Sequence, residues 1–231
     1  KSVNIETWTR QSISILETKN SQQFRFGMPG PTLKESEWQK CLDFIADSQP
    51  LPSYVVVSGS FPPGVPTTFI AQLARKLKDT PTRLIVDTSG ESLRLTAKER
   101  VYLLKPNLRE FSYLLDRKWV DVQDIETSAK EFIDKGFCEV LVLSLGEKGA
   151  VLASAEGIKM IESPRVKAKS KIGAGDSMVG GITFALANDY SLIDSLTLGV
   201  AAGTAAVLTE GTELCRKKDV WKFYEDIKKH I

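Results

Sequence analysis

The sequence has only one histidine, His230, which stands next to the C-terminal residue. This scarcity argues against a Ser-His-Asp triad and against a histidine-ligated metal centre, so acid–base chemistry falls to carboxylates or lysines. Cysteine is also scarce, because Cys41, Cys138 and Cys215 are far apart and form no CxxC pair. We therefore expect three reduced thiols and a cytoplasmic protein.

Long apolar runs and a charge excess are missing as well. No apolar stretch approaches the roughly 20 residues that span a bilayer, and the first residues, from Lys1, do not read as a signal peptide. The 31 basic and 29 acidic side chains leave a net charge of +2, which gives no reason to expect nucleic acid or a membrane surface as partner. A chain of 231 residues is long enough for one large domain or two small ones.

Hydrophobic periodicity divides the chain into alternating strands and helices. We expect strands at residues 11–16, 23–26, 54–57, 84–87, 101–104, 140–143, 150–153 and 158–161, with a hairpin turn at residues 19–21. We expect helices at residues 35–46, 67–77, 107–115, 122–135, 176–187, 192–208 and 218–229. The β-branched run Tyr54–Val57 is typical of a strand buried on both faces of a parallel sheet. The alternation indicates an α/β fold with a mostly parallel central sheet.

Small or polar residues follow four of these strands. They are Ser58-Gly59-Ser60, Asp87-Thr88-Ser89-Gly90, Lys105-Pro106-Asn107 and Ser144-Leu145-Gly146. In open α/β sheets, ligands bind at the edge where the strands end. Any one of these loops is compatible with ordinary turn chemistry, but four at one edge favour a ligand site.

The segment Gly173-Ala174-Gly175-Asp176 opens an apolar helical run, residues 178–186. A helix that begins on small residues presents unpaired backbone N–H groups, which bind anions together with the helix dipole. An aspartate in the first turn is placed to take a proton from a hydroxyl beside the anion. The segment indicates phosphoryl transfer to an alcohol, although taken alone it also fits a glycine-rich turn with an aspartate cap.

In order along the chain, these pieces resemble the PfkB-type, ribokinase-like carbohydrate kinases. The matching segments are Thr9-Arg10-Gln11, residues 24–30, residues 58–65, residues 86–91, residues 105–110, residues 144–150, residues 173–180 and residues 199–203. They cover nearly the whole chain, and the ordered set is far more specific than the Gly-Ala-Gly-Asp segment alone. The resemblance implies a three-layer α/β/α sandwich with a small β lid. Residues 9–30 would contribute lid strands, with a simple edge hairpin as the alternative.

The resemblance assigns catalytic roles to the start of the helix near residue 176. Asp176 would be the base that deprotonates the sugar hydroxyl, and the backbone N–H groups of Gly173, Ala174 and Gly175 would form the anion hole for the transferring phosphoryl group. Asn107 and Glu110 match a motif that holds Mg²⁺ and its waters near the phosphates. The same two residues also fit a helix-capping pair, so both interpretations stay open.

The resemblance also implies binding residues. For ATP these are Lys105, Asn107, Ser144, Gly146, Gly149, Val200, Ala201 and Thr204, and for the sugar phosphate they are Arg10, Ser60 and Asp176. A monovalent cation such as K⁺ would lie among Ser170, Ile172, Ala206, Thr209 and Gly211. The sequence departs from the family here, since Lys171 stands where a threonine is usual. We hypothesise that the added ammonium weakens this cation site or partly substitutes for the cation.

A larger departure lies at the N-terminus. Members of the family begin with a strand that carries an early aspartate for the sugar, then a Gly-Gly motif, and neither precedes Thr9-Arg10-Gln11 here. We therefore expect residues 1–231 to be a single kinase domain that lacks its N-terminal third, whether as a fragment or as a naturally short protein. We expect weak or no activity from these residues alone, and an active homodimer for the full-length parent.

The leading function is ATP-dependent phosphorylation of fructose 6-phosphate at O1, a glycolytic step that yields fructose 1,6-bisphosphate. The segments at residues 9–11 and 24–30 favour this substrate over tagatose 6-phosphate and fructose 1-phosphate, which the same site would accept. A non-catalytic nucleotide-binding or oligomerisation fragment is a second class of function. A Rossmann oxidoreductase is disfavoured, because no GxGxxG follows an early strand.

Overall fold

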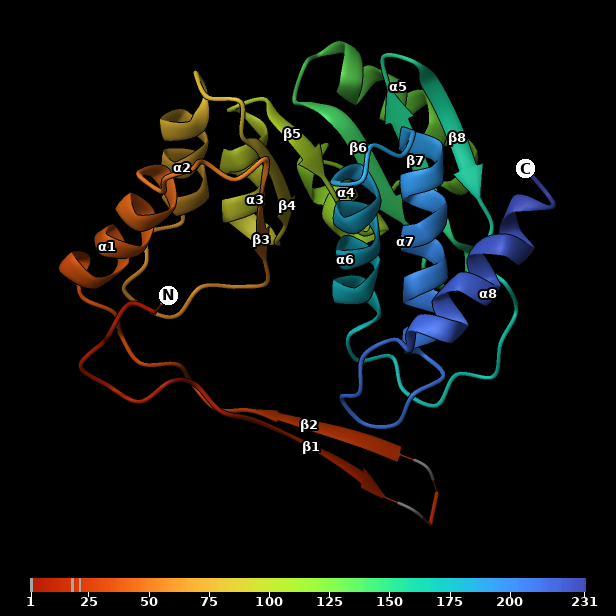
Figure 1. The fold of residues 1–231 in the computed structure, drawn as a ribbon, viewed down its shortest axis with the longest axis horizontal. Helices are drawn as coiled ribbons and strands as arrows, with labels where there is room; N and C mark the ends of the chain where they lie inside the picture. Colours follow the sequence, from red (N-terminus) through yellow and green to blue (C-terminus); the bar gives the residue numbers. More distant parts are fainter. Residues whose placement is uncertain (1, 18, 21) are drawn as a thin grey trace.

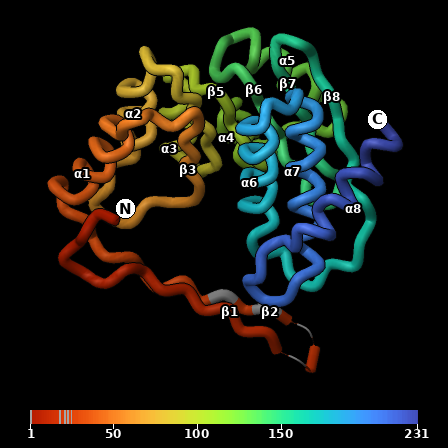
Figure 2. Tube along the Cα trace, in the orientation of Figure 1, coloured from red at the N-terminus to blue at the C-terminus, as the bar shows by residue number. Residues whose placement is uncertain are grey.

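The protein consists of an α/β body and a hairpin that extends from it (Figure 1). The computed structural model describes residues 2–17, 19–20 and 22–231, and the side chains of these residues other than 23 and 25. The N-terminus and the C-terminus lie at opposite sides of the body in the view of Figure 2. Within the described residues, no helix combines the length and the apolar character needed to cross a bilayer.

The centre of the body is a six-stranded mixed sheet in the order β3-β4-β5-β6-β7-β8. Its strands are β3 (Tyr54–Ser58), β4 (Arg83–Asp87), β5 (Val101–Leu104), β6 (Cys138–Ser144), β7 (Ala150–Ser154) and β8 (Gly157–Ile161). The first four strands are parallel to one another, whereas β6–β7 and β7–β8 pair antiparallel. The parallel strands therefore all end at the same edge, as the sequence predicts.

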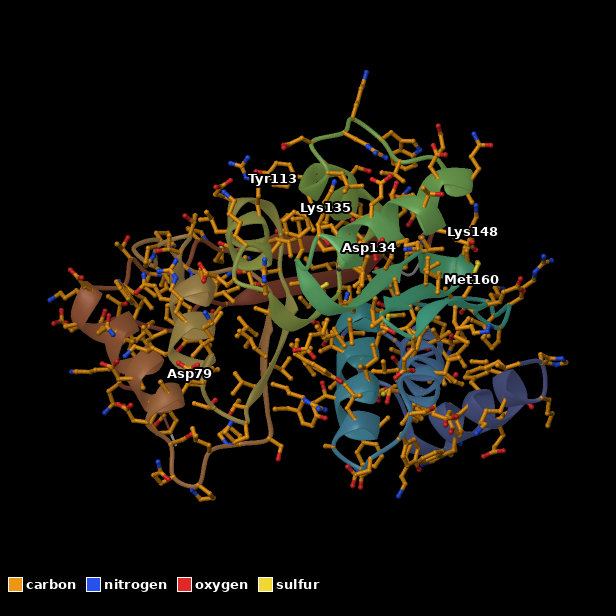
Figure 3. All side chains as sticks on the ribbon, turned by 90° about the horizontal axis from the view of Figure 1, so that it is seen from above. Asp79, Tyr113, Asp134, Lys135, Lys148 and Met160 are labelled. Atoms are coloured by element: carbon orange, nitrogen blue, oxygen red, sulfur yellow. The ribbon has the colours of Figure 1, made fainter. Side chains whose placement is uncertain are left out.

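Helices cover both faces of this sheet, which confirms the predicted α/β sandwich. One face carries α1 (Glu35–Ala46), α2 (Phe69–Leu77), α3 (Gly90–Ala97), α4 (Leu108–Leu114) and α5 (Ile125–Asp134), and the other carries α6 (Ala174–Leu186), α7 (Leu192–Ala206) and α8 (Lys217–Lys228). Figure 3 shows the blue C-terminal helices on one side of the green strands and the green helices on the other.

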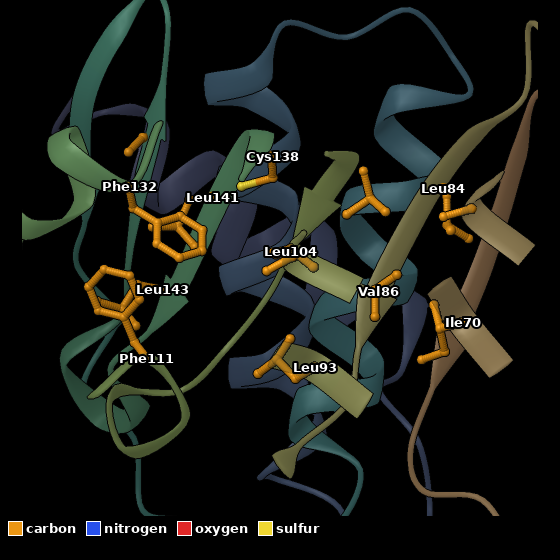
Figure 4. Close-up of a cluster of buried hydrophobic side chains, with 14 of the residues drawn as sticks. Ile70, Leu84, Val86, Leu93, Leu104, Phe111, Phe132, Cys138, Leu141 and Leu143 are labelled. Atoms are coloured by element: carbon orange, nitrogen blue, oxygen red, sulfur yellow. The ribbon is translucent and has the colours of Figure 1, made fainter. Parts of the chain in front are cut away.

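The alternation of side chains along each strand produces two separate cores. On β4, Val86 belongs to the cluster with α1 to α5, and Ile85 belongs to the cluster with α6 to α8. Figure 4 shows the first cluster, in which Leu93, Leu104 and Phe111 are fully buried. Strands buried on both faces consist of almost continuous apolar residues, which explains why β4, β5 and β6 are recognisable in the sequence.

Two expectations about elements were wrong. Helix α3 was not predicted, because Ser89 and Gly90 at its start read as a polar loop. Strand β3 was expected to be buried on both faces, yet Val56 is 40% exposed. The reason is its position, since β3 pairs only with β4 within the described residues and is an edge strand of the sheet. The predicted helix at residues 122–135 begins as a 3₁₀ turn, Val122–Asp124, before α5.

The hairpin forms a second, two-stranded sheet from β1 (Ser12–Glu17) and β2 (Gln22–Gly27). Lys19 and Asn20 form the predicted turn, while Ser21 lies outside the described residues. The register pairs Ile13 with Phe26 and Ile15 with Phe24, so that four apolar side chains share one face. Each of the four is 45–51% exposed. We call this face the hairpin strip.

Candidate active site

The start of α6 presents an exposed carboxylate beside free helix N–H groups. Gly173 occupies the N-cap with φ 77°, a left-handed conformation that glycine adopts without steric cost. Ala174 and Gly175 follow as the first helical residues, and helix geometry leaves their N–H groups without intrahelical acceptors. Asp176 stands third in the helix and is exposed. A negatively charged group could therefore bind here with Asp176 at its side.

The last residue of β3, at the start of the loop that follows, places a hydroxyl against this carboxylate. Ser58 Oγ donates a hydrogen bond to Asp176 Oδ1 at 3.1 Å, which leaves Oδ2 outside that bond. The loop is held by two further bonds, from Gly59 N to the carbonyl of Asp87 at 2.8 Å and from Thr88 Oγ1 to the carbonyl of Gly59 at 2.7 Å. Sequence reasoning did not assign a contact to Ser58, because only the fold brings β3 and α6 together.

A buried ion pair lies next to this carboxylate. Lys105 Nζ is 3.1 Å from Asp87 Oδ1, and the two side chains are only 5% and 18% exposed. A methyl group at Gly175 would lie 3.9 Å from Lys105 Nζ, so the ammonium reaches the first turn of α6. Burial raises the pKa of Asp87, the positive charge of Lys105 opposes this, and the charge of Asp176 adds to it. The carboxylates of Asp87 and Asp176 are therefore close enough to interact.

Asp87 is a residue that sequence reasoning missed as a site residue. The sequence did predict that a polar loop follows β4. The only available signal was the charge itself, an aspartate at the end of a buried apolar strand, where an unpaired charge would be costly.

Asn107 and Glu110 form the capping box that the sequence offered as an alternative to a metal site. Asn107 Oδ1 accepts a hydrogen bond from Glu110 N at 2.9 Å, and Asn107 N donates to Glu110 Oε2 at 2.8 Å. Asn107 is exposed and Glu110 is half-buried, and the Oε1 atom of Glu110 takes no part in the cap. Capping therefore does not exclude a metal role, because a carboxylate oxygen that the cap does not use suits a hydrated Mg²⁺.

A cavity of about 990 Å³ adjoins the start of α6. It brings together five of the residues predicted to bind ATP with two from the predicted anion hole: Ser144, Gly146, Gly149, Val200, Thr204, Ala174 and Gly175. Lys148 and Met160, which are close together in Figure 3, line the same cavity. Its volume falls within the usual range for small-molecule sites. Lys105 and Asn107 lie outside its lining.

Two of the predicted nucleotide residues also have structural reasons for their identity. Gly149 adopts φ 100°, and a Cβ atom there would collide with the carbonyl oxygen of Ile161. Thr204 Oγ1 donates to the carbonyl of Val200 at 2.8 Å and lies 2.8 Å from Ser163 Oγ. Gly149 therefore permits a close backbone approach, and Thr204 anchors the cavity wall on α7.

The residues predicted to hold a monovalent cation converge in one loop network. Ser170 Oγ donates to the carbonyl of Gly211 at 2.8 Å, and Ile172 N donates to Ser170 Oγ at 3.2 Å. Thr209 Oγ1 lies within hydrogen-bonding distance, 2.7 Å, of the carbonyl of Ala206. Ser170, Ala206 and Thr209 are buried, and the oxygen atoms of this network fit an alkali cation in donor type.

Two lysines flank this loop network. Lys169 Nζ pairs with Glu210 at 3.1 Å, which ties the two loop segments together. Lys171 lines the 990 Å³ cavity instead. Its side chain therefore lies on the cavity side of the loop network.

The predicted sugar-phosphate residues are less closely grouped. Arg10 lies at the base of the hairpin, where its guanidinium is within 2.9 Å of the position that a Cβ atom at Gly27 would take. Ser60 is exposed in the loop after β3, two residues beyond Ser58. Within the described residues, no hydrogen bond or ion pair joins Arg10 to the other predicted site residues. In the same residues, no group of three or more His, Cys, Asp or Glu side chains could hold a metal ion.

Comparison with known proteins identifies the family. The family described as pfkB family carbohydrate kinase matches residues 1–219. The chain belongs to the pfkB family of carbohydrate kinases. Within this family it is 39% identical over 223 residues to the ATP-dependent 6-phosphofructokinase isozyme 2 of Mycobacterium tuberculosis, and 38% identical to that of Escherichia coli. It is 34% identical over 203 residues to the 1-phosphofructokinase of Escherichia coli.

The fold of this family member agrees with solved structures. It matches the crystal structure of Escherichia coli phosphofructokinase-2 in complex with potassium with a TM-score of 0.90 and 37% identity, over 96% of this chain and 72% of that one. Against the curated proteins, 96% of this chain covers 66% of the mycobacterial and 72% of the Escherichia coli isozyme 2. The chain thus spans about two thirds of the length of these relatives.

Proposed function

We propose that this protein transfers the γ-phosphoryl group of ATP to O1 of fructose 6-phosphate and forms fructose 1,6-bisphosphate and ADP. The observation that carries the proposal is the exposed carboxylate of Asp176, which stands on the first turn of α6 next to a cavity of about 990 Å³. Phosphoryl transfer needs positioning and charge stabilisation more than covalent chemistry, and the start of a helix supplies both.

In the proposed reaction, Asp176 accepts the proton of the sugar hydroxyl as its oxygen attacks the γ-phosphorus. The new P–O bond forms as the bond to the bridging oxygen breaks, and the electron pair of that bond leaves with ADP. Ser58 Oγ fixes one oxygen of Asp176, so the other remains available for the proton. The N–H groups of Ala174 and Gly175 would donate to the transferring phosphoryl oxygens.

The cofactors of the proposed reaction follow from the donor types. When bound with ATP, Mg²⁺ would neutralise phosphate charge, and Glu110 Oε1 is a carboxylate oxygen that the cap leaves for its hydration shell. K⁺ would fit the oxygen-rich network of Ser170, Ala206, Thr209 and Gly211, and the potassium complex of the Escherichia coli relative supports this. Lys105 would place its ammonium near the phosphates from its buried position beside Asp87.

The sugar phosphate is the least constrained part of the proposal. Relatives named 6-phosphofructokinase isozyme 2 are 38–39% identical, and relatives named 1-phosphofructokinase are 26–34% identical, which favours fructose 6-phosphate. The alternatives are fructose 1-phosphate and tagatose 6-phosphate. The three free thiols are consistent with a cytoplasmic site of action.

A coupled ADP-release assay with these three sugar phosphates tests the proposal. We expect the highest kcat/KM with fructose 6-phosphate, and a preference for another sugar phosphate would replace the substrate assignment. The result that would favour a non-catalytic nucleotide-binding role is a nucleotide that raises the melting temperature of the full-length parent while none of the three sugar phosphates is turned over.

We also propose that the hairpin strip pairs two copies of the protein. Its four exposed apolar side chains, Ile13, Ile15, Phe24 and Phe26, lie on a hairpin that extends from the body (Figure 1). An isolated two-stranded hairpin is marginally stable in water, so burial against a second copy would stabilise it. Sedimentation of the wild type and of Phe26→Asp tests this, because a dimer that dissociates in the variant is the expected result.

A further inference from the structure

A second pocket lies at the opposite end of the sheet from the candidate active site. Its volume is about 670 Å³, and Tyr54, Arg83 and Tyr102 line it at the starts of β3, β4 and β5. The candidate active site is instead built on residues at the ends of these strands, such as Ser58 and Asp87. We call the second pocket the strand-start pocket, and nothing in the proposed reaction uses this pocket.

Aromatic rings form one wall of the strand-start pocket. The rings of Tyr54 and Tyr102 are 6.1 Å apart, and the guanidinium carbon of Arg83 lies 4.7 Å from the centroid of the Tyr102 ring. Arg83 Nη1 also donates to Tyr54 Oη at 3.2 Å. Tyr190, which is 36% exposed, and Leu186 extend this wall from the end of α6. Arg83 therefore occupies the face of Tyr102, and Tyr190 and Leu186 offer aromatic and apolar surface to a ligand.

The rim of the pocket carries more negative than positive charge. Glu139 on β6, Glu156 in the turn between β7 and β8, and Asp189 after α6 are exposed lining residues. None of the three side chains forms an ion pair or a side-chain hydrogen bond within the described residues. Among the lining residues Arg83 carries the opposing positive charge, so the lining has a net charge of −2. The C-terminal end of α6 adds partial negative charge, since its last turn has no basic residue.

We propose that the strand-start pocket binds an organic cation with an aromatic or apolar body, such as an aromatic amine. The body would pack against Tyr190 and Leu186, and the ammonium would face Glu139, Glu156 and Asp189. A volume of about 670 Å³ suits a ligand of this size, and the lining offers both apolar side chains and charged groups to it. A simple anion or a nucleotide is disfavoured by the same charges.

Three indoles of one shape and different charge test the proposal on the 231-residue chain. Calorimetric titration with tryptamine, tryptophol and indole-3-acetate compares a cation, a neutral molecule and an anion. We expect tryptamine to bind at least about fivefold more tightly than tryptophol, and indole-3-acetate to bind most weakly, as attraction to partly exposed carboxylates implies. Equal affinities for the three indoles, or no binding of tryptamine at millimolar concentration, would overturn the proposal.

Charge-removing variants then locate the site. In Glu139→Gln and in Asp189→Asn, the ratio of tryptamine to tryptophol affinity should fall by about two- to threefold, the loss expected for a screened surface charge. The control is Glu225→Gln, which removes an exposed carboxylate on α8, outside the pocket, and should leave the ratio unchanged. Because the readout is a ratio within each variant, a change in overall stability does not alter it. An equal fall in Glu225→Gln would show general charge attraction and refute the site.

Discussion

Breaking the buried pair between Lys105 and Asp87 should separate what the pair does for stability from what it does for the reaction. Lys105 is 4% exposed, and the sheet and the start of α6 surround its ammonium. Three variants are informative: Asp87→Asn, Lys105→Met and the double variant. In Asp87→Asn the ammonium stays buried without a counter-charge, whereas in Lys105→Met the carboxylate retains some contact with water.

The expected losses in the free energy of unfolding follow from the exposed fractions of the Lys105 and Asp87 side chains. Removing one partner of a buried ion pair costs about 3–5 kcal/mol, and we expect about 3 kcal/mol for Asp87→Asn because the lysine side chain is only 5% exposed. We expect about 1–2 kcal/mol for Lys105→Met, since Asp87 is 18% exposed and can take up a proton. The double variant buries no charge from this pair, so it should lie within about 1 kcal/mol of the wild type.

The pKa of Asp87 supports the same expectation. Burial raises it despite the ion pair with Lys105, so desolvation outweighs the attraction. A raised pKa in the folded state means that the folded protein holds this proton to higher pH than the unfolded chain. The contribution of Asp87 to stability therefore falls as pH rises from its unfolded pKa through its folded pKa. Asp87→Asn should remove this part of the pH dependence.

Urea unfolding with a constant m-value measures the three free energies, and the ADP-release assay measures the reaction. We expect the double variant to be stable and to lose most of its turnover, because the ammonium near the anion site is gone. Additive losses of stability in the double variant would refute the buried-pair reasoning. A double variant with wild-type turnover would remove Lys105 from the reaction.

Two further predictions concern the helices that hold α6 in place. Asp194 accepts hydrogen bonds from Lys228 and Tyr224, and the bond from Lys228 is the largest of the effects that lower its pKa. Asp194→Asn should lower the free energy of unfolding by about 1–2 kcal/mol at neutral pH. This loss should vanish as pH falls through the lowered folded pKa of Asp194, and urea unfolding at several pH values measures the trend. In Gly199→Ala the new Cβ would lie 2.5 Å from Ile182 Cγ1 across the α6–α7 contact, so the free energy of unfolding should fall by about 1–2 kcal/mol. In Gly180→Ala the new Cβ would meet open space, so the free energy of unfolding should rise by up to about 1 kcal/mol in the same assay. Equal effects of the two glycine variants would contradict the close packing of α6 on α7.

Local patterns predicted most of the fold. The helix at residues 35–46 and the strand at residues 101–104 have the bounds expected from apolar spacing. The cap at Asn107 follows from four consecutive residues of sequence. Helix α3 was missed because Gly90 at its start carries a turn signal that the tertiary structure overrides.

The order in which the strands pair in the sheet could not be predicted from the sequence. The β-branched run of β3 looks the same in a central strand and in an edge strand, and only the pairing shows that Val56 is 40% exposed.

The candidate site likewise has a part that the sequence predicted and a part that only the fold shows. The first turn of α6 and the cavity residues follow from local motifs and from the family resemblance, and the fold brings most of them together. The bond from Ser58 to Asp176 connects the end of β3 with the start of α6, and the pair of Asp87 with Lys105 connects the ends of two neighbouring strands. No local spacing predicts such contacts, since they depend on which strands are neighbours.

The most direct test of the central claim is the turnover of Asp176→Asn in the active protein. The variant keeps the size of the side chain and the start of α6, but it cannot accept the proton. We expect the ADP-release rate to fall by about a thousandfold, in the range of general base catalysis, while ATP affinity changes by less than about threefold. A rate within about tenfold of the wild type, with ATP still bound, would contradict the assignment of Asp176 as the base.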